Sequence, residues 1–343
     1  MSLMKPLVSI LIPAFNAQEY IADTLRSAVG QTWEKKEIIV LDDGSVDQTG
    51  SIAEQFASEH VSVVRQENQG AAGTRNDLLS LYQGDYIQWL DADDLLAHDK
   101  VAKQMEALER HGHNERTLLS SAWGYFRYRP RKAEFHKTQL WCDLSPLEWL
   151  LRKMENNLHM QTATWLASRR LTEAAGPWDK RLLGDDDGEY FARVIMGSDG
   201  IRFIPEAKTY YRTTGSVRLS HIGRSDRKME AQFLSMRLNI DYIRSIKDDE
   251  RVRRACVTYL QTWSSHFYPA RLDIFKEAER LASVLGGRLE MPGLRWKYAW
   301  ITPVFGLARA KQAQFVLPQL KESVIRRWDK LQYYIENSVL GRC

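Results

Sequence analysis

The sequence predicts an α/β fold, a mixed but mainly parallel sheet between helices, followed by a C-terminal helical extension. Three observations predict it. Short β-branched runs alternate with helical spacing through the first 98 residues, which is typical of parallel strands joined by helices. A polar cluster follows each of four expected strands. Beyond residue 225 nearly every periodic segment is helical.

The first 98 residues predict four strands and three helices. Each strand is a short apolar run, and each helix has apolar residues three or four positions apart. The expected strands are 8–12, 37–41, 61–64 and 86–90. The expected helices are 20–29, one that Ser45 or Asp47 caps and that ends at Phe56, and 71–82.

The pattern changes near Leu118, where we expect the same domain to continue as a mixed sheet. The expected strands are 118–128, 162–168, 201–204 and 208–211, and the expected helices are 146–154 and 187–196. We therefore predict one α/β domain over 5–224, with parts 5–98 and 99–224, and a mostly helical region over 225–343.

Composition restricts the class of protein. Hydrophobic residues make up 44% and charged residues 27% of the chain, as in ordinary globular proteins. The longest charge-free apolar stretches, 255–270 and 298–308, are too short to span a bilayer. Three widely spaced cysteines predict neither a disulfide framework nor a zinc site, which favours a reducing, cytoplasmic compartment. We expect no signal peptide, because no apolar run follows a basic N-terminus.

Charge is distributed unevenly along the chain. The net charge is +4, but from Asp226 onward there are 21 Lys and Arg against 13 Asp and Glu, which gives +8. This excess favours an acidic partner such as a membrane surface, or is simply a solvated helical surface. Nucleic acid is not expected, since no recognition motif accompanies the charge.

Four polar clusters follow the four expected strands. They are Pro13 to Asn16, Asp42 to Ser45, Asn68 to Gly70 with Arg75 just beyond, and Asp91 to Asp94. Because ligands of open α/β sheets bind beyond the carboxyl ends of the strands, we expect one binding site at this edge.

Asp91 and Asp93 are candidate metal ligands. Carboxylates this close repel each other unless a cation neutralises them, and two at a strand end can share a hard divalent cation with phosphate oxygens. The alternative is a capped loop, with Asp94 as the N-cap of the next helix.

Asp43 and Arg75 are candidate nucleotide contacts. Asp43 can accept a hydrogen bond from a pyrimidine imide or a ribose hydroxyl, and the alternative is an Asx-turn. Arg75 is expected in the first turn of a helix, where the dipole disfavours a cation. Its partner is therefore expected to be a phosphate or a neighbouring aspartate.

These clusters carry a resemblance to a known family. The segments VSILIPAFN (8–16), IIVLDDGSVDQT (38–49), QGAAGTRN (69–76) and GDYIQWLDADDL (84–95) resemble non-processive, inverting glycosyltransferases of family 2, which have the GT-A fold. The resemblance covers about residues 5–212. It implies a catalytic domain over 5–224, with a nucleotide-binding part before residue 99 and an acceptor-side part after it.

The resemblance also implies residue roles. Asp43 would hold uracil, and Arg75 would lie near the nucleotide. Mn²⁺ or Mg²⁺ would be held on the diphosphate by a DxD motif. The implied nucleotide-binding residues are Pro13, Ala14, Asn16, Asp43, Arg75, Asp91 and Ala92, and the implied metal ligands are Asp91 and Asp93.

The family's catalytic base is an aspartate in an acidic pair within a segment that ends in Arg. Aligning GDDDGEYFAR on Arg193 makes Asp187 the base and Asp186 the preceding acid. Because three aspartates stand in a row, Asp185, Asp186 and Asp187 all remain candidates. An acidic first turn of a helix is the alternative explanation.

Other features keep two interpretations. His221 is a candidate metal ligand or a surface histidine. Trp178 is a candidate platform for a sugar ring or a core residue. The segment Arg295 to Phe305, rich in aromatic and basic residues, is a candidate contact with the inner membrane face, or a helical extension that packs on the domain or on a second subunit. The Gln-x-x-Arg-Trp signature of processive polymerases is absent.

The resulting hypothesis is a transferase that moves one hexosyl or N-acetylhexosaminyl group, from a UDP-sugar donor, to a glycan or lipid-linked acceptor in polysaccharide biosynthesis. A catalytically silent nucleotide- or glycan-binding module is the alternative from another class. A nucleotidyltransferase is disfavoured, because the loop after the first strand is not a Gly-rich phosphate loop.

Overall fold

Parallel strands form the centre of the larger sheet. The computed structural model describes residues 5–214, 225–293, 303, 317 and 321–336. The strand order is β3-β2-β1-β4-β7, parallel except for β7. Leu11 packs into one hydrophobic cluster while Ile10 and Ile12 pack into another, because successive side chains of a strand point to opposite faces. The strands are β1 (Val8–Ala14), β2 (Lys36–Asp42), β3 (Val61–Arg65), β4 (Tyr86–Trp89) and β7 (Ala167–Ser168).

Three helices follow the first three strands and are shorter than predicted. They are α1 (Ile21–Val29), α2 (Thr49–Glu54) and α3 (Gly70–Leu78). Helix α1 buries Ile21, Leu25 and Ala28, the periodic set that predicted it. Helix α2 begins at Thr49, whose N–H donates to Asp47 Oδ1 (2.9 Å).

A smaller sheet carries the acceptor-side part of the chain. Its order is β5-β8-β6, with β6 and β8 parallel. Helix α4 (Lys100–Arg110) packs against β6 and β8. The strands are β5 (Leu95–Leu96), β6 (Thr117–Phe126) and β8 (Gly200–Arg212).

Two predicted strands, 201–204 and 208–211, are one strand in the structure. The pairing with β6 moves from Ser121 opposite Ile204 to Ala122 opposite Lys208. The intervening residues form a bulge that includes Pro205, which has no N–H to donate to the ladder. The prediction was wrong in reading this interruption as the end of a strand.

The predicted strand 162–168 was also wrong. Residues Thr162–Thr164 form a 3₁₀ turn, η2, and only Ala167–Ser168 pair as a strand. The Gln161 side chain accepts a hydrogen bond from Ala163 N (2.6 Å) and the Thr164 hydroxyl donates to Gln161 O (2.6 Å). Such local side-chain bonds compete with strand pairing.

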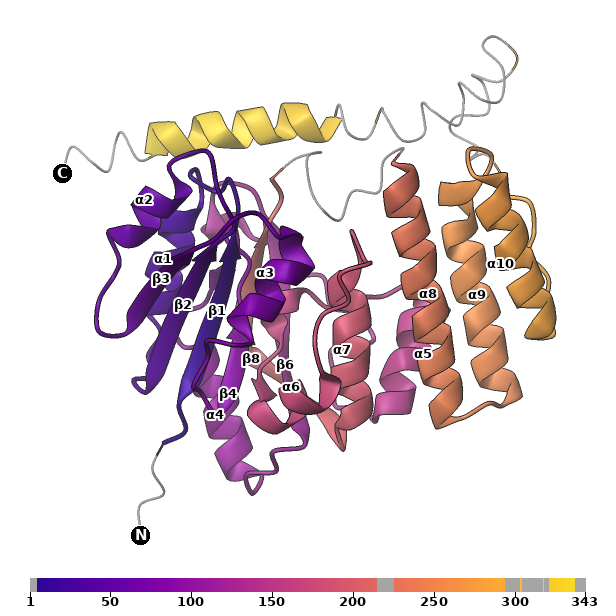
Figure 1. The fold of residues 1–343 in the computed structure, drawn as a ribbon, viewed down its shortest axis with the longest axis horizontal. Coiled ribbons are helices and arrows are strands. Elements are labelled where there is room, and N and C mark those ends of the chain that lie inside the picture. Colours follow the sequence, from indigo (N-terminus) through magenta and orange to yellow (C-terminus); the bar gives the residue numbers. More distant parts are fainter. Residues whose placement is uncertain (1–4, 215–224, 294–302, 304–316, 318–320, 337–343) are drawn as a thin grey trace.

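The remaining named elements are helices, as predicted for 146–154 and 187–196 and, within the described ranges 225–293 and 321–336, for most of the C-terminal region. Figure 1 shows α8, α9 and α10 side by side at the end of the molecule away from β3. A further helix covers 321–336, and no helix in the described parts of the chain is long and apolar enough to cross a bilayer. The named helices are η1 (Pro130–Lys132), α5 (Pro146–Asn156), α6 (Arg169–Ala175), α7 (Asp186–Gly197), α8 (Asp226–Ile246), α9 (Glu250–Phe267) and α10 (Leu272–Val284).

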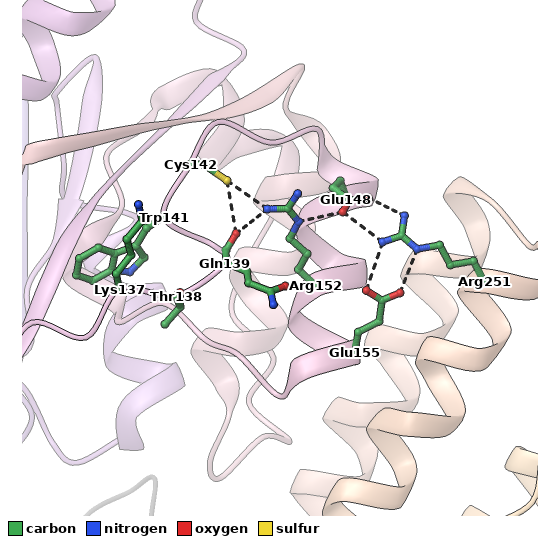
Figure 2. Close-up of a pocket in the computed structure, with 9 residues that line it drawn as sticks. All are labelled: Lys137, Thr138, Gln139, Trp141, Cys142, Glu148, Arg152, Glu155 and Arg251. Carbon is green, nitrogen blue, oxygen red and sulfur yellow. Dashed lines mark hydrogen bonds and ion pairs between the residues drawn. The ribbon is translucent and has the colours of Figure 1, made fainter.

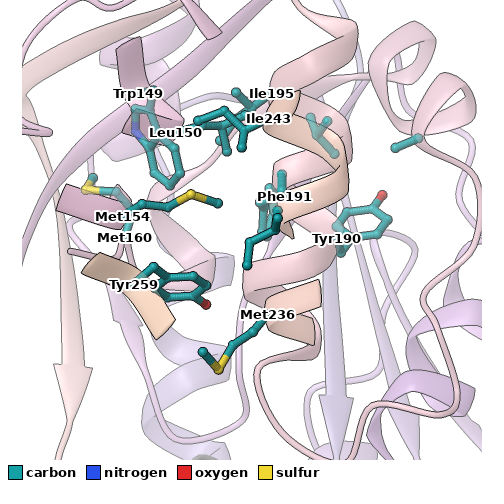
Figure 3. Close-up of a cluster of buried hydrophobic side chains, with 14 of the residues drawn as sticks. Trp149, Leu150, Met154, Met160, Tyr190, Phe191, Ile195, Met236, Ile243 and Tyr259 are labelled. Carbon is teal, nitrogen blue, oxygen red and sulfur yellow. The ribbon is translucent and has the colours of Figure 1, made fainter. Parts of the chain in front are cut away.

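The C-terminal helices share a hydrophobic core with the α/β domain. Figure 3 shows side chains of α5, α7, α8 and α9 meeting in one cluster. The core therefore continues across residue 225, the predicted domain boundary, and α8 is held against the acidic segment that begins α7. The labelled members are Trp149, Leu150, Met154, Met160, Tyr190, Phe191, Ile195, Met236, Ile243 and Tyr259.

Candidate active site

The loops after β1 and β2 are bonded to each other at the carboxyl edge of the larger sheet. Asn16, in the left-handed region at φ 48°, donates its N–H to Ser45 Oγ (2.9 Å) and accepts from Val46 N (3.0 Å) through Oδ1. Asn tolerates this conformation better than most residues. Asp43 N donates to Ala14 O (2.8 Å), so Pro13, Ala14 and Asn16 lie beside Asp43.

Asp43 ties the loop after β3 to this edge. Its Oδ1 accepts from Gln66 Nε2 (2.9 Å) and Gln69 N (2.8 Å), and its Oδ2 accepts from Gly70 N (2.9 Å). A carboxylate has about four acceptor positions. Asp43, which is 3% exposed, therefore keeps about one acceptor position on Oδ2 beyond those used within the protein.

The turn after β4 presents two carboxylates and buries a third. Thr24 Oγ1 donates to Ala92 O and Asp94 O, both at 2.9 Å. The Asp94 carboxyl accepts from Arg212 N (2.8 Å) and from Gln161 Nε2, and burial raises its pKa well above the ordinary value. Asp94 is not the N-cap of the next helix, since α4 begins at Lys100.

Asp91 and Asp93 have the chemistry of a divalent cation site. Both are partly exposed, whereas Asp94 is buried and its carboxyl is occupied by protein donors. Among the described residues, there is no group of three or more His, Cys, Asp or Glu side chains that could hold a metal ion. The two carboxylates thus fit a hard cation that takes its other ligands from a substrate.

Arg75 joins the two acidic segments. Its guanidinium lies 3.0 Å from Asp91 Oδ1 and 2.6 Å from Asp186 Oδ2, and 4.6 Å from the ring centroid of Trp178. Burial lowers the pKa of Arg75, but Asp186 and Asp91 raise it by more. Arg75 lies in the second turn of α3, not the first as expected, and its partners within the protein are the aspartates.

The three consecutive aspartates have different environments. Asp185, at φ 57°, accepts from Ser235 Oγ (2.6 Å), and burial raises its pKa. Burial also raises the pKa of Asp186, to about 6, despite the opposing charge of Arg75. Asp187 is partly exposed and accepts from Thr162 Oγ1 (3.1 Å) and Gly188 N (2.9 Å).

Trp178 is a core residue in this structure. Its side chain is 1% exposed and stacks on Tyr190 with ring centroids 4.0 Å apart. Asn76 bonds both backbone groups of Trp178. The structure therefore supports the interpretation of Trp178 as a core residue, packed below Arg75, over that of a platform for a sugar ring.

The buried polar groups that support the acidic segment were not predicted from the sequence. Ser235 on α8 bonds Asp185, and Lys153 on α5 donates to Gly188 O (3.1 Å) and Asn239 Oδ1 (3.2 Å). A usable signal existed, because Lys153 interrupts the apolar face of its helix. Ser235 and Asn239, four residues apart, lie on the buried face of α8.

An aromatic cluster beside the acidic segment was also missed. Trp123 lies 4.7 Å from Tyr125, 6.0 Å from Tyr211 and 5.2 Å from His159, measured between ring centroids. Desolvation lowers the pKa of His159, and the nearby charges of Asp187 and Asp185 oppose that shift. These rings come from β6, β8 and the loop after α5, so no local sequence pattern unites them.

A surface hollow elsewhere has no comparable chemistry. Figure 2 shows it beside α5 and α9, with a cavity volume of about 480 Å³. Arg251 is paired with Glu148 (2.9 Å) and Glu155 (3.1 Å), and Arg152 with Glu148 (2.9 Å). Both arginines of the hollow are therefore already neutralised by these glutamates.

Some predicted positions lie outside the described residues. His221 is among them, and so is the segment 295–305 apart from Pro303. Their predicted roles stay predictions.

The chain is similar in sequence to known glycosyltransferases. Residues 9–163 match the sequence profile described as Glycosyl transferase family 2. TuaG from Bacillus subtilis, a glycosyltransferase named for teichuronic acid biosynthesis, is 41% identical over 124 residues, 35% of this chain and 47% of TuaG. WfaP from Escherichia coli, a UDP-Glc:α-D-GlcNAc-diphosphoundecaprenol β-1,3-glucosyltransferase, is 38% identical over 104 residues, 30% of this chain and 41% of WfaP. The matched stretch spans less than half of either relative.

A solved structure shares the fold. Residues 1–349 of TarS from S. aureus, in complex with UDP-GlcNAc, align with a TM-score of 0.63 and 18% identity, covering 79% of each chain. The alignment confirms the predicted GT-A fold class.

Proposed function

We propose that this chain transfers one hexosyl or N-acetylhexosaminyl group from a UDP-sugar to a glycan or lipid-linked acceptor. The transfer is proposed to invert the configuration of the sugar and to serve polysaccharide biosynthesis. The chain belongs to glycosyl transferase family 2 through residues 9–163. One observation carries the proposal. Arg75 joins Asp91 of the strand-end cluster to Asp186 of the acidic segment, so the candidate donor and acceptor groups meet at one place.

The donor is proposed to bind along the carboxyl edge of the larger sheet. Pro13, Ala14 and Asn16 would line the base and ribose pocket. Asp43 has one acceptor position left after its three protein hydrogen bonds, which suits a single donor such as the imide N–H of uracil. The UDP and UDP-sugar named for the relatives are consistent with this choice.

Asp91 and Asp93 are proposed to hold Mn²⁺ or Mg²⁺ on the diphosphate, with Ala92 between them against the phosphates. When bound, such a cation would stabilise the charge that develops on the departing diphosphate. Arg75 would supply further positive charge beside Asp91 and keep that carboxylate oriented.

Asp187 is proposed as the general base. A base must reach the hydroxyl whose proton it takes. Asp187 is partly exposed, whereas Asp186 is held by Arg75 and Asp185 by Ser235. Asp187 would take the proton as the acceptor oxygen bonds the anomeric carbon. The bond from that carbon to the diphosphate oxygen breaks in the same displacement, which inverts the configuration.

The acceptor is proposed to lie over the accessible rings of the aromatic cluster, Tyr125, Tyr211 and His159, which contact the buried Trp123, since ring faces pack well against sugars. Thr162 would keep the Asp187 carboxylate turned toward it. A lipid-linked acceptor would be reached from the inner membrane face. We infer no nucleic-acid partner.

The test is turnover by purified protein with a panel of UDP-sugars and Mn²⁺, for the wild type, Asp187→Asn and Asp186→Asn. We expect Asp187→Asn to bind UDP nearly normally in calorimetry while turnover falls by about 10²-fold or more, within the range for loss of a general base.

Asp186→Asn should instead change stability more than turnover. The same loss of turnover with Asp186→Asn, but not with Asp187→Asn, would move the base by one residue. Binding of UDP without hydrolysis or transfer for any donor would support the silent module.

A further inference from the structure

The helix over 321–336 turns its charged side toward the catalytic domain. Its three acidic residues, Glu322, Asp329 and Glu336, are seven positions apart and so lie on one face. Arg127 bonds Glu322 with two N–H groups (2.8 and 2.9 Å), and Arg129 pairs with Asp329 (2.7 Å) and with Glu336 (2.9 Å).

Basic and aromatic groups complete this docked face. Lys330 Nζ lies 2.5 Å from Glu19 Oε1, and Tyr333 packs against Tyr128 with ring centroids 6.1 Å apart. Arg326 bonds Thr214 O and lies over the Tyr128 ring. The helix is therefore fixed by its polar side.

The opposite face is apolar and faces solvent. Val324 is 67% exposed, Trp328 62%, Leu331 50% and Ile335 49%. Their spacing of four, three and four places them on one stripe. A surface helix of a globular protein normally does the reverse, burying its apolar stripe, and an exposed apolar patch of this kind marks an interaction site.

Charge indicates which partner fits this stripe. From residue 294 to the end the sequence has nine Lys and Arg and three Asp and Glu. The three acids are the ones paired with Arg127, Arg129 and Arg131, so they do not offset the basic residues outside. Residues 294–320 alone contribute four basic residues and no acid. An apolar stripe with Trp and surrounding basic residues suits an anionic lipid surface.

The helix also lies on the correct side of the molecule. Its partners Glu19, Tyr128 and Thr214 follow β1, β6 and β8, at the carboxyl ends of those strands. Figure 1 shows the helix across that edge of the α/β domain. A bilayer against the outer stripe would thus lie near the edge that carries Asp91 and Arg75.

We propose that Val324, Trp328, Leu331 and Ile335 form a docking surface for an anionic bilayer, on which the helix lies in the plane of the interface. This deepens the proposed function, because a lipid-linked acceptor lies in that surface. The exposed stripe and the basic residues around it do not depend on sugar transfer.

The test is co-sedimentation of the full chain with vesicles of phosphatidylglycerol and phosphatidylcholine, compared with phosphatidylcholine alone. We expect wild-type binding to the anionic vesicles that weakens with added salt. The variant Trp328→Ser/Leu331→Ser should bind on the order of 10²-fold more weakly, since two apolar side chains leave the lipid. The matched control Val46→Ser/Val284→Ser removes two exposed apolar side chains elsewhere, at 90% and 74% exposure, and should bind like wild type.

The outcomes separate the alternatives. Both changed residues are exposed, so the thermal unfolding curve and UDP-sugar hydrolysis in solution should not change, and loss of binding then reports the surface alone. No wild-type binding, or equal binding by both double variants, would overturn the proposal. A dimer in analytical ultracentrifugation that Trp328→Ser/Leu331→Ser dissociates, without vesicle binding, would assign the stripe to a second copy of the chain instead.

Discussion

Replacing Arg75 by Met should make the stability of the protein strongly dependent on pH. Met keeps much of the side-chain volume over Trp178 but removes the charge that lies between Asp91 and Asp186. The variant then has two buried or half-buried carboxylates without their cation, and breaking a buried pair in this way typically costs about 3–5 kcal/mol.

The magnitude of the pH effect comes from Asp186. Its pKa is about 6 in the folded protein against an ordinary 3.8. Because the folded value is raised, the stability linked to this group is fully present at low pH and decreases as the pH rises from about 4 to about 6.

Removing an adjacent Arg raises a carboxyl pKa by about one to three units. A further shift of about two units extends the decrease to about pH 8. At 1.36 kcal/mol per unit, the variant loses about 3 kcal/mol more than wild type between pH 5 and pH 8.

The assay is urea unfolding followed by tryptophan fluorescence at about pH 5 and about pH 8, with a chelator present so that no divalent cation replaces the lost charge. The double variant Arg75→Met/Asp186→Asn is the matched control, because the amide does not ionise. We expect it to lose the extra pH dependence.

An equal loss of stability by Arg75→Met at both pH values would refute the reasoning. So would a double variant with the same pH dependence as Arg75→Met. Either result would mean that packing over Trp178, and not the charge between the acidic segments, is what Arg75 provides.

Two further predictions concern single carboxylates. Asp93→Ala should abolish Mn²⁺-dependent binding of UDP in calorimetry while leaving the fold intact, because the Asp93 carboxylate is proposed to share the cation with the diphosphate. The control Asp241→Ala, which removes an exposed carboxylate on α8, should bind UDP like wild type. Ser235→Ala should lower the free energy of unfolding by about 1–3 kcal/mol, because the partly buried Asp185 carboxylate loses its 2.6 Å donor. The loss should be larger at neutral than at acidic pH, since protonated Asp185 needs the donor less, and Ser245→Ala on the exposed side of α8 should change stability little.

The order of strands and helices from β1 to β4 was determined by the sequence alone. The sequence contains local patterns, such as the apolar run Val8 to Ile12 and the spacing of Ile21, Leu25 and Ala28. Burial of such a run favours a strand, and burial of such a stripe favours a helix. The same holds for the polar clusters, because parallel strands place their carboxyl ends at one edge. Asp43, Asp91 and Asp93 could therefore be predicted from the sequence to lie at one edge of the sheet.

Only the tertiary structure decided what those residues contact. From the sequence, the partner of Arg75 could be either a phosphate or an aspartate. All three consecutive aspartates were also candidates for the base. The choice depends on Asp186 reaching Arg75, on Ser235 reaching Asp185 and on Asp187 staying partly exposed. These contacts join residues about 50 to 110 positions apart, and the free energy of such pairs depends on burial and distance, which no local pattern contains.

The helix over 321–336 is a second case in which the sequence gives the helix and the tertiary structure decides which face is buried. Its amphipathic spacing is present in the sequence, and the ordinary expectation is that the apolar stripe faces the core. The structure reverses that orientation, because Arg127 and Arg129 lie where Glu322, Asp329 and Glu336 can reach them. Which face of a helix is buried follows from the surface that it meets, and that surface exists only after the α/β domain has folded.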